Sequence, residues 1–183
     1  NIHDVTTGNT MAGILLINSS EVLVSGAHDT GSINGFLATN VNRCSITDSS
    51  VGNNSLYGFI VRNSKEISID RCDSSGSSGN AFFLFNSEDI LINASYAHVF
   101  NPPYLEGDVY GANIDYCRNV SILNSIFAEC PESGMYITNS ERILVKKAHL
   151  TENQHYGISM MQCTNASIEE SLIMNNTISG IDL

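Results

Sequence analysis

The sequence predicts an all-β solenoid, a right-handed parallel β-helix of about seven to eight rungs with three short parallel sheets and about 23 residues per rung. Three observations predict this fold. A glycine-led pattern recurs eight times, apolar and polar residues alternate within each copy, and the alternation breaks at Asn, Ser or Gly where a helix would continue. We expect one domain over residues 1–183, cut from a longer helix, with an inserted loop at 98–110.

Each copy of the repeat begins at a glycine, or once at an alanine. The copies start at Gly13, Gly35, Gly58, Ala81, Gly111, Gly134, Gly157 and Gly180, so successive starts lie 22, 23, 23, 30, 23, 23 and 23 residues apart. The single long step comes from seven extra residues near His98 to Tyr110. Because long loops on a rigid stack often carry function, we expect a site near this insertion.

The columns of the repeat predict three strands per rung. Apolar residues stand one and three positions after the start, as Phe59 and Val61 do, which predicts a strand with one face turned inward. A second apolar pair follows nine and eleven positions after the start, as Ile67 and Ile69. Fourteen positions after the start the residue is small, and a weaker third strand follows; its apolar members are Val51, Phe127, Leu150 and Ile173.

An asparagine recurs at the turn between the first and second strands. It stands at Asn18, Asn40, Asn63, Asn86 and Asn139. Amides aligned at one turn can hydrogen-bond up and down a stack, so we expect an asparagine ladder there. Tyr116 and Gln162 interrupt it.

The composition excludes some classes of partner. The chain has a net charge of -11 and no cluster of Lys and Arg, so we expect no binding to nucleic acid or to an anionic membrane. The longest apolar runs are too short to cross a bilayer, so we expect no membrane insertion. The five cysteines have neither CxxC nor zinc spacing, and we interpret several as small core residues.

Through this repeat, nearly the whole chain resembles the right-handed parallel β-helix superfamily, the pectin-lyase-like fold. Members include polysaccharide lyases, polygalacturonase-like hydrolases, mannuronan epimerases, phage tailspikes and noncatalytic surface proteins. The resemblance implies a protein that binds or acts on carbohydrate at an extracellular or cell-surface location. It concerns the fold more than the activity.

Two local motifs resemble those of enzyme families, and both lack the catalytic residues. The stretch 108–122 (DVYGANIDYCRNVSI) is similar to the NTDG strand of polygalacturonases, but the catalytic Asp would fall at Tyr110 and its partner near Glu129 and Cys130. No GHG or RIK motif follows. The segment from Tyr110 to Asn113 is similar to the YGFDPH motif of epimerases without its Asp and His. No catalytic residue is therefore carried over.

An apolar stripe is expected on the outer face of the first sheet. Two and four positions after the repeat start, where polar residues would meet water, stand Leu15, Ile17, Leu37, Ile60, Phe83, Phe85, Tyr136 and Met161. Such a stripe indicates a ligand-binding face, or a surface covered by another segment or a second subunit. Arg62, Asn113 and Asp115 are the polar exceptions.

Two hypotheses follow. In the first, the chain is a polysaccharide lyase, epimerase or hydrolase that binds a glycan along this face. Its candidate catalytic residues are Asp115, Glu106, Asp108, Arg62 and Tyr136, and its candidate substrate-binding residues are Phe83, Phe85, Asn113, Tyr104 and Tyr110. We expect no cofactor, with Ca²⁺ on the carboxylates as the open alternative. In the second, the chain is a noncatalytic adhesin, tailspike or surface module, and the stripe is an assembly face.

Overall fold

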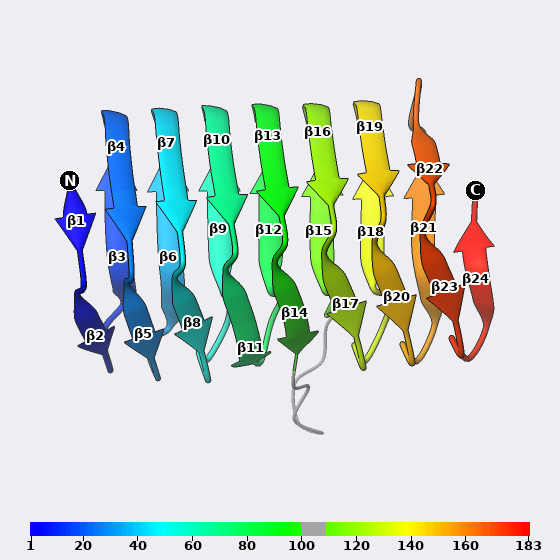
Figure 1. The fold of residues 1–183 in the computed structure, drawn as a ribbon, viewed down its shortest axis with the longest axis horizontal. Helices are drawn as coiled ribbons and strands as arrows, with labels where there is room; N and C mark the ends of the chain where they lie inside the picture. Colours follow the sequence, from blue (N-terminus) through cyan, green and yellow to red (C-terminus); the bar gives the residue numbers. More distant parts are fainter. Residues whose placement is uncertain (100–108) are drawn as a thin grey trace.

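The computed structural model describes residues 1–99 and 109–183, and within them the chain is the predicted stack of coils (Figure 1). The rungs stand side by side, and the two ends of the chain lie at opposite ends of the stack. The described residues form three eight-stranded sheets in which every paired strand is parallel to its neighbour. No helix occurs among them, and so none that is long and apolar enough to cross a membrane.

Each rung contributes one strand to each sheet, in the order sheet C, sheet A, sheet B. Sheet C holds the strands that follow the repeat glycine: β3 (Ala12–Ile17), β6 (Asn34–Thr39), β9 (Phe59–Arg62), β12 (Phe82–Phe85), β15 (Ala112–Asp115), β18 (Met135–Thr138), β21 (Tyr156–Met161) and β24 (Ser179–Asp182). Sheet A holds the second strands: β1 (Ile2–His3), β4 (Ser20–Ser25), β7 (Asn42–Thr47), β10 (Lys65–Asp70), β13 (Glu88–Asn93), β16 (Arg118–Leu123), β19 (Glu141–Lys146) and β22 (Ser167–Glu169).

Sheet B holds the third strands: β2 (Thr6–Gly8), β5 (His28–Thr30), β8 (Ser50–Gly52), β11 (Asp73–Ser77), β14 (Tyr96–Val99), β17 (Ile126–Ala128), β20 (His149–Thr151) and β23 (Leu172–Met174). The insertion leaves the register intact. Phe82 pairs with Phe59 on one side and with Ala112 on the other, although the steps are 23 and 30 residues. The described strands on either side of the insertion, β14 and β15, thus keep their places in sheets B and C.

The inward columns form one continuous apolar core, as predicted. Phe36, Phe59 and Phe82 are fully buried on successive rungs, with ring centroids 5.9 and 5.4 Å apart. Phe127 on sheet B then meets Phe82 edge-on at 6.0 Å. No single coil could bury these rings, so the stacking of rungs supplies the hydrophobic stabilisation.

The column of small residues fourteen positions after the repeat start lies at the corner between sheets A and B, and hydrogen bonds between rungs explain it. The Ser95 hydroxyl donates to Asn93 O at 2.8 Å and accepts the N–H of Cys72 on the rung before at 3.1 Å. The same pair of hydrogen bonds is made at this corner by Ser49, Ser125 and Ser171. It is also made at the corner between sheets C and A by Ser64, Ser87 and Ser140. Cys72 takes a serine position, and its thiol donates to Asp70 O at 3.4 Å.

The asparagine ladder is present at the corner between sheets C and A. Asn40 donates to Asn18 at 3.0 Å, and Asn86 donates to Asn63 at 2.8 Å. These residues have φ between +47° and +55°, a left-handed conformation that Asn tolerates better than most residues. The backbone of the turn therefore selects asparagine, and the ladder follows from the stacking.

Candidate functional site

The outer face of sheet C carries two columns of side chains. The strand register sets the first as Leu15, Leu37, Ile60, Phe83, Asn113, Tyr136, Ser159 and Asp182, and the second as Ile17, Thr39, Arg62, Phe85, Asp115, Thr138 and Met161. The first column changes from aliphatic to aromatic at β12, and the second carries Arg62 at β9 and Phe85 at β12. The middle of the face is therefore chemically distinct from its ends.

Four aromatic rings cross this middle region, and we call them the aromatic row: Tyr57, Phe83, Phe85 and Tyr116. The ring of Tyr57 stacks on Phe83 with centroids 5.4 Å apart, and Phe83 lies parallel to Phe85 at 6.5 Å. Tyr116 meets Phe85 edge-on at 6.0 Å. The row thus runs from the corner before β9, over β12, to the corner after β15.

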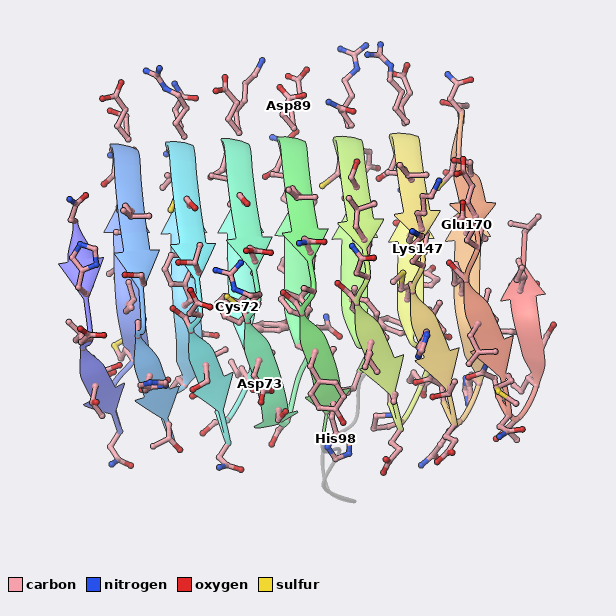
Figure 2. All side chains as sticks on the ribbon, in the orientation of Figure 1. Cys72, Asp73, Asp89, His98, Lys147 and Glu170 are labelled. Atoms are coloured by element: carbon pink, nitrogen blue, oxygen red, sulfur yellow. The ribbon has the colours of Figure 1, made fainter. Side chains whose placement is uncertain are left out.

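Arg62 stands over the aromatic row, and no carboxylate of residues 1–99 or 109–183 pairs with it. Its guanidinium carbon lies 5.1 Å from the centroid of Phe83, a cation–π contact. All eight Lys and Arg residues belong to the described part of the chain, and the other seven each pair with a carboxylate, as Lys147 does with Glu170 on the next rung (Figure 2). Arg62 is therefore the cation that a ligand can neutralise.

A shallow hollow opens beside these groups, and we call it the sheet C hollow. It measures about 280 Å³ and is lined by Arg62, Asn63, Phe83 and Phe85. Phe83 and Phe85 are half-buried, so parts of both rings remain open to solvent. The sequence predicted Arg62, Phe83 and Phe85 as site residues, and the structure places them around one hollow.

Asp115 is held by the rung that follows it. Thr138 Oγ1 and Asn139 Nδ2 donate to Asp115 Oδ1 at 2.6 and 2.9 Å. Within the described residues no side chain donates to Oδ2. Phe85 stands between Asp115 and Arg62 in the outer column, so the two charged residues are separated by two strand spacings, about 9.6 Å.

Of the three tyrosines predicted as site residues, the two that the structure describes stack on each other, outside the aromatic row. Tyr110 and Tyr136 stack with centroids 4.7 Å apart, and the Tyr136 hydroxyl donates to Met161 Sδ at 3.5 Å. Tyr110 is only 7% exposed, so it packs against Tyr136 and offers little surface to a ligand. Asn113 is half-buried between Phe83 and Tyr136 in the first column.

The remaining predicted residues lie elsewhere. Tyr104, Glu106 and Asp108 fall outside the described residues, so their positions relative to Asp115 stay a prediction. Among residues 1–99 and 109–183, no three His, Cys, Asp or Glu side chains form a group suited to a metal ion. The Ca²⁺ expectation depended on Glu106 and Asp108, and it also stays a prediction.

The apolar stripe needs one correction. Ile60 belongs to the outward column but is only 2% exposed, because this chain covers it. Leu37 and Phe83 flank it in the column, and Tyr57 stacks on Phe83 beside it. No separate segment or second subunit is needed over Ile60.

The sequence interpretation overlooked two members of the aromatic row. Tyr57 stands one position before the repeat glycine, and tyrosine recurs at that position as Tyr110 and Tyr156. That recurrence was the available signal. Tyr116 was noted only as an interruption of the ladder, and the available signal was an aromatic residue in a column that otherwise holds asparagine or glutamine.

The comparisons with known proteins agree with the fold. A family model described as "Right handed beta helix region" matches residues 104–183. The structure resembles the A-module of the Azotobacter vinelandii mannuronan C-5 epimerase AlgE6 (TM-score 0.77, 14% identity, covering 86% of this chain and 42% of that one). It also resembles the periplasmic alginate epimerase AlgG (0.76, 14%, 89% and 43%) and the Streptococcus pneumoniae surface adhesin PfbA (0.64, 13%, 92% and 55%).

A search of curated proteins by sequence finds no match. The chain spans less than half the length of the two epimerase structures. At 10–14% identity these likenesses concern the fold alone. The repeat, the three parallel sheets and the structural neighbours together show that this chain folds as a right-handed parallel β-helix.

Proposed function

We propose that the chain binds an acidic polysaccharide on the outer face of sheet C, as part of an extracellular or cell-surface carbohydrate-active protein. The observation that carries the proposal is Arg62, whose unpaired guanidinium stands over Phe83 at the sheet C hollow. A chain with a net charge of -11 has ample carboxylates with which to pair its cations, yet none in the described part of the chain pairs with Arg62. An anionic ligand is the partner that this arrangement lacks.

The chemistry of the face suits a uronate residue. Aromatic side chains offer apolar faces against which the C–H groups of a sugar ring can pack, and Phe83 and Phe85 present two such faces. A guanidinium binds a carboxylate through two parallel hydrogen bonds, which a neutral sugar cannot reproduce. Ligand pockets usually begin at about 300 Å³, so a hollow of about 280 Å³ matches one residue of a longer chain better than a whole small ligand.

The overall charge opposes an acidic ligand only at long range. Salt screens charges beyond about 8 Å at physiological ionic strength, whereas a contact with Arg62 acts at hydrogen-bond distance. Two of the structural neighbours are named as epimerases of mannuronan or alginate, one of them as periplasmic, and a third is named as a surface adhesin. These names support both the class of ligand and the location.

A chemical step is a further part of the proposal. In it, Asp115 acts with Arg62 and Tyr136, together with Glu106 and Asp108 from the inserted loop. Asp115 has one oxygen committed to Thr138 and Asn139, which leaves the other to face a ligand. Lyase, epimerase and hydrolase reactions differ in their products, so product analysis separates them.

The test is binding to uronate oligomers of two to six residues, with neutral oligomers of the same lengths as controls. Arg62→Ala should weaken uronate binding by about tenfold or more, because it removes a charge-assisted contact. Arg43→Ala is the matched control, since Arg43 is an exposed arginine whose guanidinium already pairs with Glu21 at 2.7 Å. Equal affinities for the two variants, or no uronate binding by the native chain, would contradict the proposal.

A second candidate function rests on a different part of the face. Leu15 and Ile17 are each 52% exposed on β3, and Met11 beside them is 79% exposed. These side chains fit the noncatalytic alternative, in which the aliphatic end of sheet C is an assembly face. Sedimentation of the native chain and of a Leu15→Thr, Ile17→Thr variant tests it. A monomer in both cases would count against assembly through β3.

A further inference from the structure

Tyr116 occupies a backbone position that suits asparagine. Its φ is +53°, and it interrupts a column in which Asn86 and Asn139 have φ values of +47° and +48°. A bulky side chain is strained in this left-handed conformation, and Tyr116 is also 58% exposed. The residue therefore gains little from burial to offset the strain. A left-handed backbone is common at the turns of this stack, as at Arg43, Arg142 and Lys147 with φ of +60°, +57° and +52°; an exposed aromatic side chain in an asparagine column is what distinguishes Tyr116.

A second hollow lies next to Tyr116, and we call it the corner hollow. It measures about 350 Å³ and is lined by Asn63, Ser64, Lys65, Asn86, Ser87, Glu88, Tyr116 and Arg118. Asn63 also lines the sheet C hollow, so the two hollows adjoin at the corner between sheets C and A. One surface thus continues from the aromatic row onto sheet A.

The corner hollow differs in charge from the sheet C hollow. Lys65 pairs with Glu88 at 3.5 Å and with Asp89 at 3.4 Å, and Asp89 lies at the edge of the stack (Figure 2). Arg118 pairs with Glu141 at 3.3 Å. With its cations already neutralised, this hollow offers donors and acceptors for hydroxyl groups and carries no spare positive charge.

The direction of the aromatic row distinguishes two paths for a long ligand. Along the axis of the stack, Asn113 follows Phe83 and Asp115 follows Phe85, so neither outer column offers successive aromatic faces. Across sheet C, four rings follow one another with centroid steps of 5.4, 6.5 and 6.0 Å. The continuous aromatic surface crosses sheet C from Tyr57, before β9, over β12 to Tyr116, after β15.

We propose that the bound glycan crosses sheet C over β12, along the aromatic row, and turns at Tyr116 into the corner hollow. The corner hollow is then a second subsite for a further sugar residue. The inference rests on the proposed function and adds the path and the second subsite. Tyr116 is then a binding residue that stands where the neighbouring rungs have the ladder asparagine. The corner hollow recognises hydroxyl groups, while the sheet C hollow recognises the carboxylate.

The variant Tyr116→Asn tests the path, because it restores the residue that the turn prefers. Its melting temperature should equal or exceed that of the native chain. Its affinity for uronate oligomers of three or more residues should fall about five- to tenfold, the value of an aromatic contact. Its affinity for the dimer should stay the same. Tyr96→Asn, on the outer face of sheet B, controls for the loss of a surface tyrosine.

Phe83→Ala separates failure of the path from failure of the proposed function. This variant should weaken binding at every oligomer length. If Phe83→Ala weakens binding but Tyr116→Asn changes no affinity, or changes all lengths equally, the second subsite is wrong and the proposed function stands. If the native chain binds no uronate oligomer of any length, both are wrong.

Discussion

The side-chain amide of Asn139 donates a hydrogen bond of 2.9 Å to Oδ1 of Asp115, which thereby takes the place of a missing asparagine. In the asparagine ladder at the corner between sheets C and A, here called the outer ladder, the amide of Asn86 donates to the asparagine one rung earlier, Asn63. One rung before Asn139 stands Tyr116, which has no side-chain carbonyl to accept this bond. The predicted catalytic carboxylate therefore also has a structural role.

Asp115→Ala should lower the free energy of unfolding by about 1–2 kcal/mol, because Thr138 and Asn139 both lose their acceptor at a half-exposed site. Asp115→Asn keeps an acceptor oxygen and should cost less. Urea denaturation measures both. Thr39→Ala is the control, since Thr39 is half-buried in the same column without a side-chain hydrogen bond among the described residues. A loss as large for Thr39→Ala would refute the structural role.

A second asparagine ladder, inside the coil, should matter more than the outer one. Asn153 is fully buried; its Oδ1 accepts the Cys130 N–H at 3.0 Å, and its Nδ2 donates to Asn176 Oδ1 at 2.9 Å. Asn153→Ala should cost about 2–4 kcal/mol, because it leaves buried polar groups unpaired. Asn86→Ala, in the exposed outer ladder, should cost about 1 kcal/mol or less. Equal losses in urea denaturation would show that burial does not set the difference.

The buried thiols predict a loss of stability at alkaline pH. Burial raises the pKa of Cys44, Cys72 and Cys117 to about 11 and that of Cys130 to about 12, from an ordinary 9.0. Between pH 9 and 11 the unfolded chain therefore loses thiol protons that the folded chain keeps, so the free energy of unfolding falls as pH rises.

Cys72→Ser isolates this effect, because serine stands at the equivalent corner as Ser49 and Ser95 and does not titrate. The variant should match the native chain at pH 7 and lose less stability at pH 10–11. Parallel pH profiles would argue against the thiol contribution. In the folded chain at pH 8, a thiol reagent should label the half-buried Cys163 first and the four buried thiols only after unfolding.

The repeat glycine is predicted to be replaceable only where its neighbour is small. A Cβ built on Gly134 would lie 2.8 Å from Gly157 O and 3.2 Å from Cδ2 of Leu150, sixteen residues further along the chain. Gly134→Ala should therefore cost about 1–3 kcal/mol. At the natural exception, Ala81, the residue sixteen positions later is Ala97. Ala81→Gly should cost about 1 kcal/mol or less, and denaturation midpoints should rank the two variants in this order.

The sequence predicted the fold well because each column of the repeat reports one physical environment. Val61 and Leu84 face inward, and Asn63 and Asn86 share a left-handed turn, so period and chemistry agree at every level. The inner ladder was missed although it has its own column, nineteen positions after the repeat start. Its described members are Ser32, Asn54, Ser77, Cys130, Asn153 and Asn176, so no single residue type marks the column.

The candidate site was predictable only in part, because it depends on contacts between different columns. The outward positions of Arg62, Phe83 and Phe85 follow from the period of the strand. The stacking of Tyr57 on Phe83 involves a corner residue whose direction no period specifies, and the burial of the outward Ile60 was likewise not predicted. The absence of an acidic partner for Arg62 is likewise a three-dimensional fact, since sequence spacing alone does not show which charges meet.

The 30-residue step that leaves Phe82 in register with Ala112 has a practical consequence for engineering. The corner between sheets B and C accepts added chain without disturbing the strands on either side. Because that corner recurs on every rung, peptides grafted there would stand in a row at multiples of about 4.8 Å. The stack can thus serve as a ruler for displaying epitopes or enzyme segments at chosen spacings.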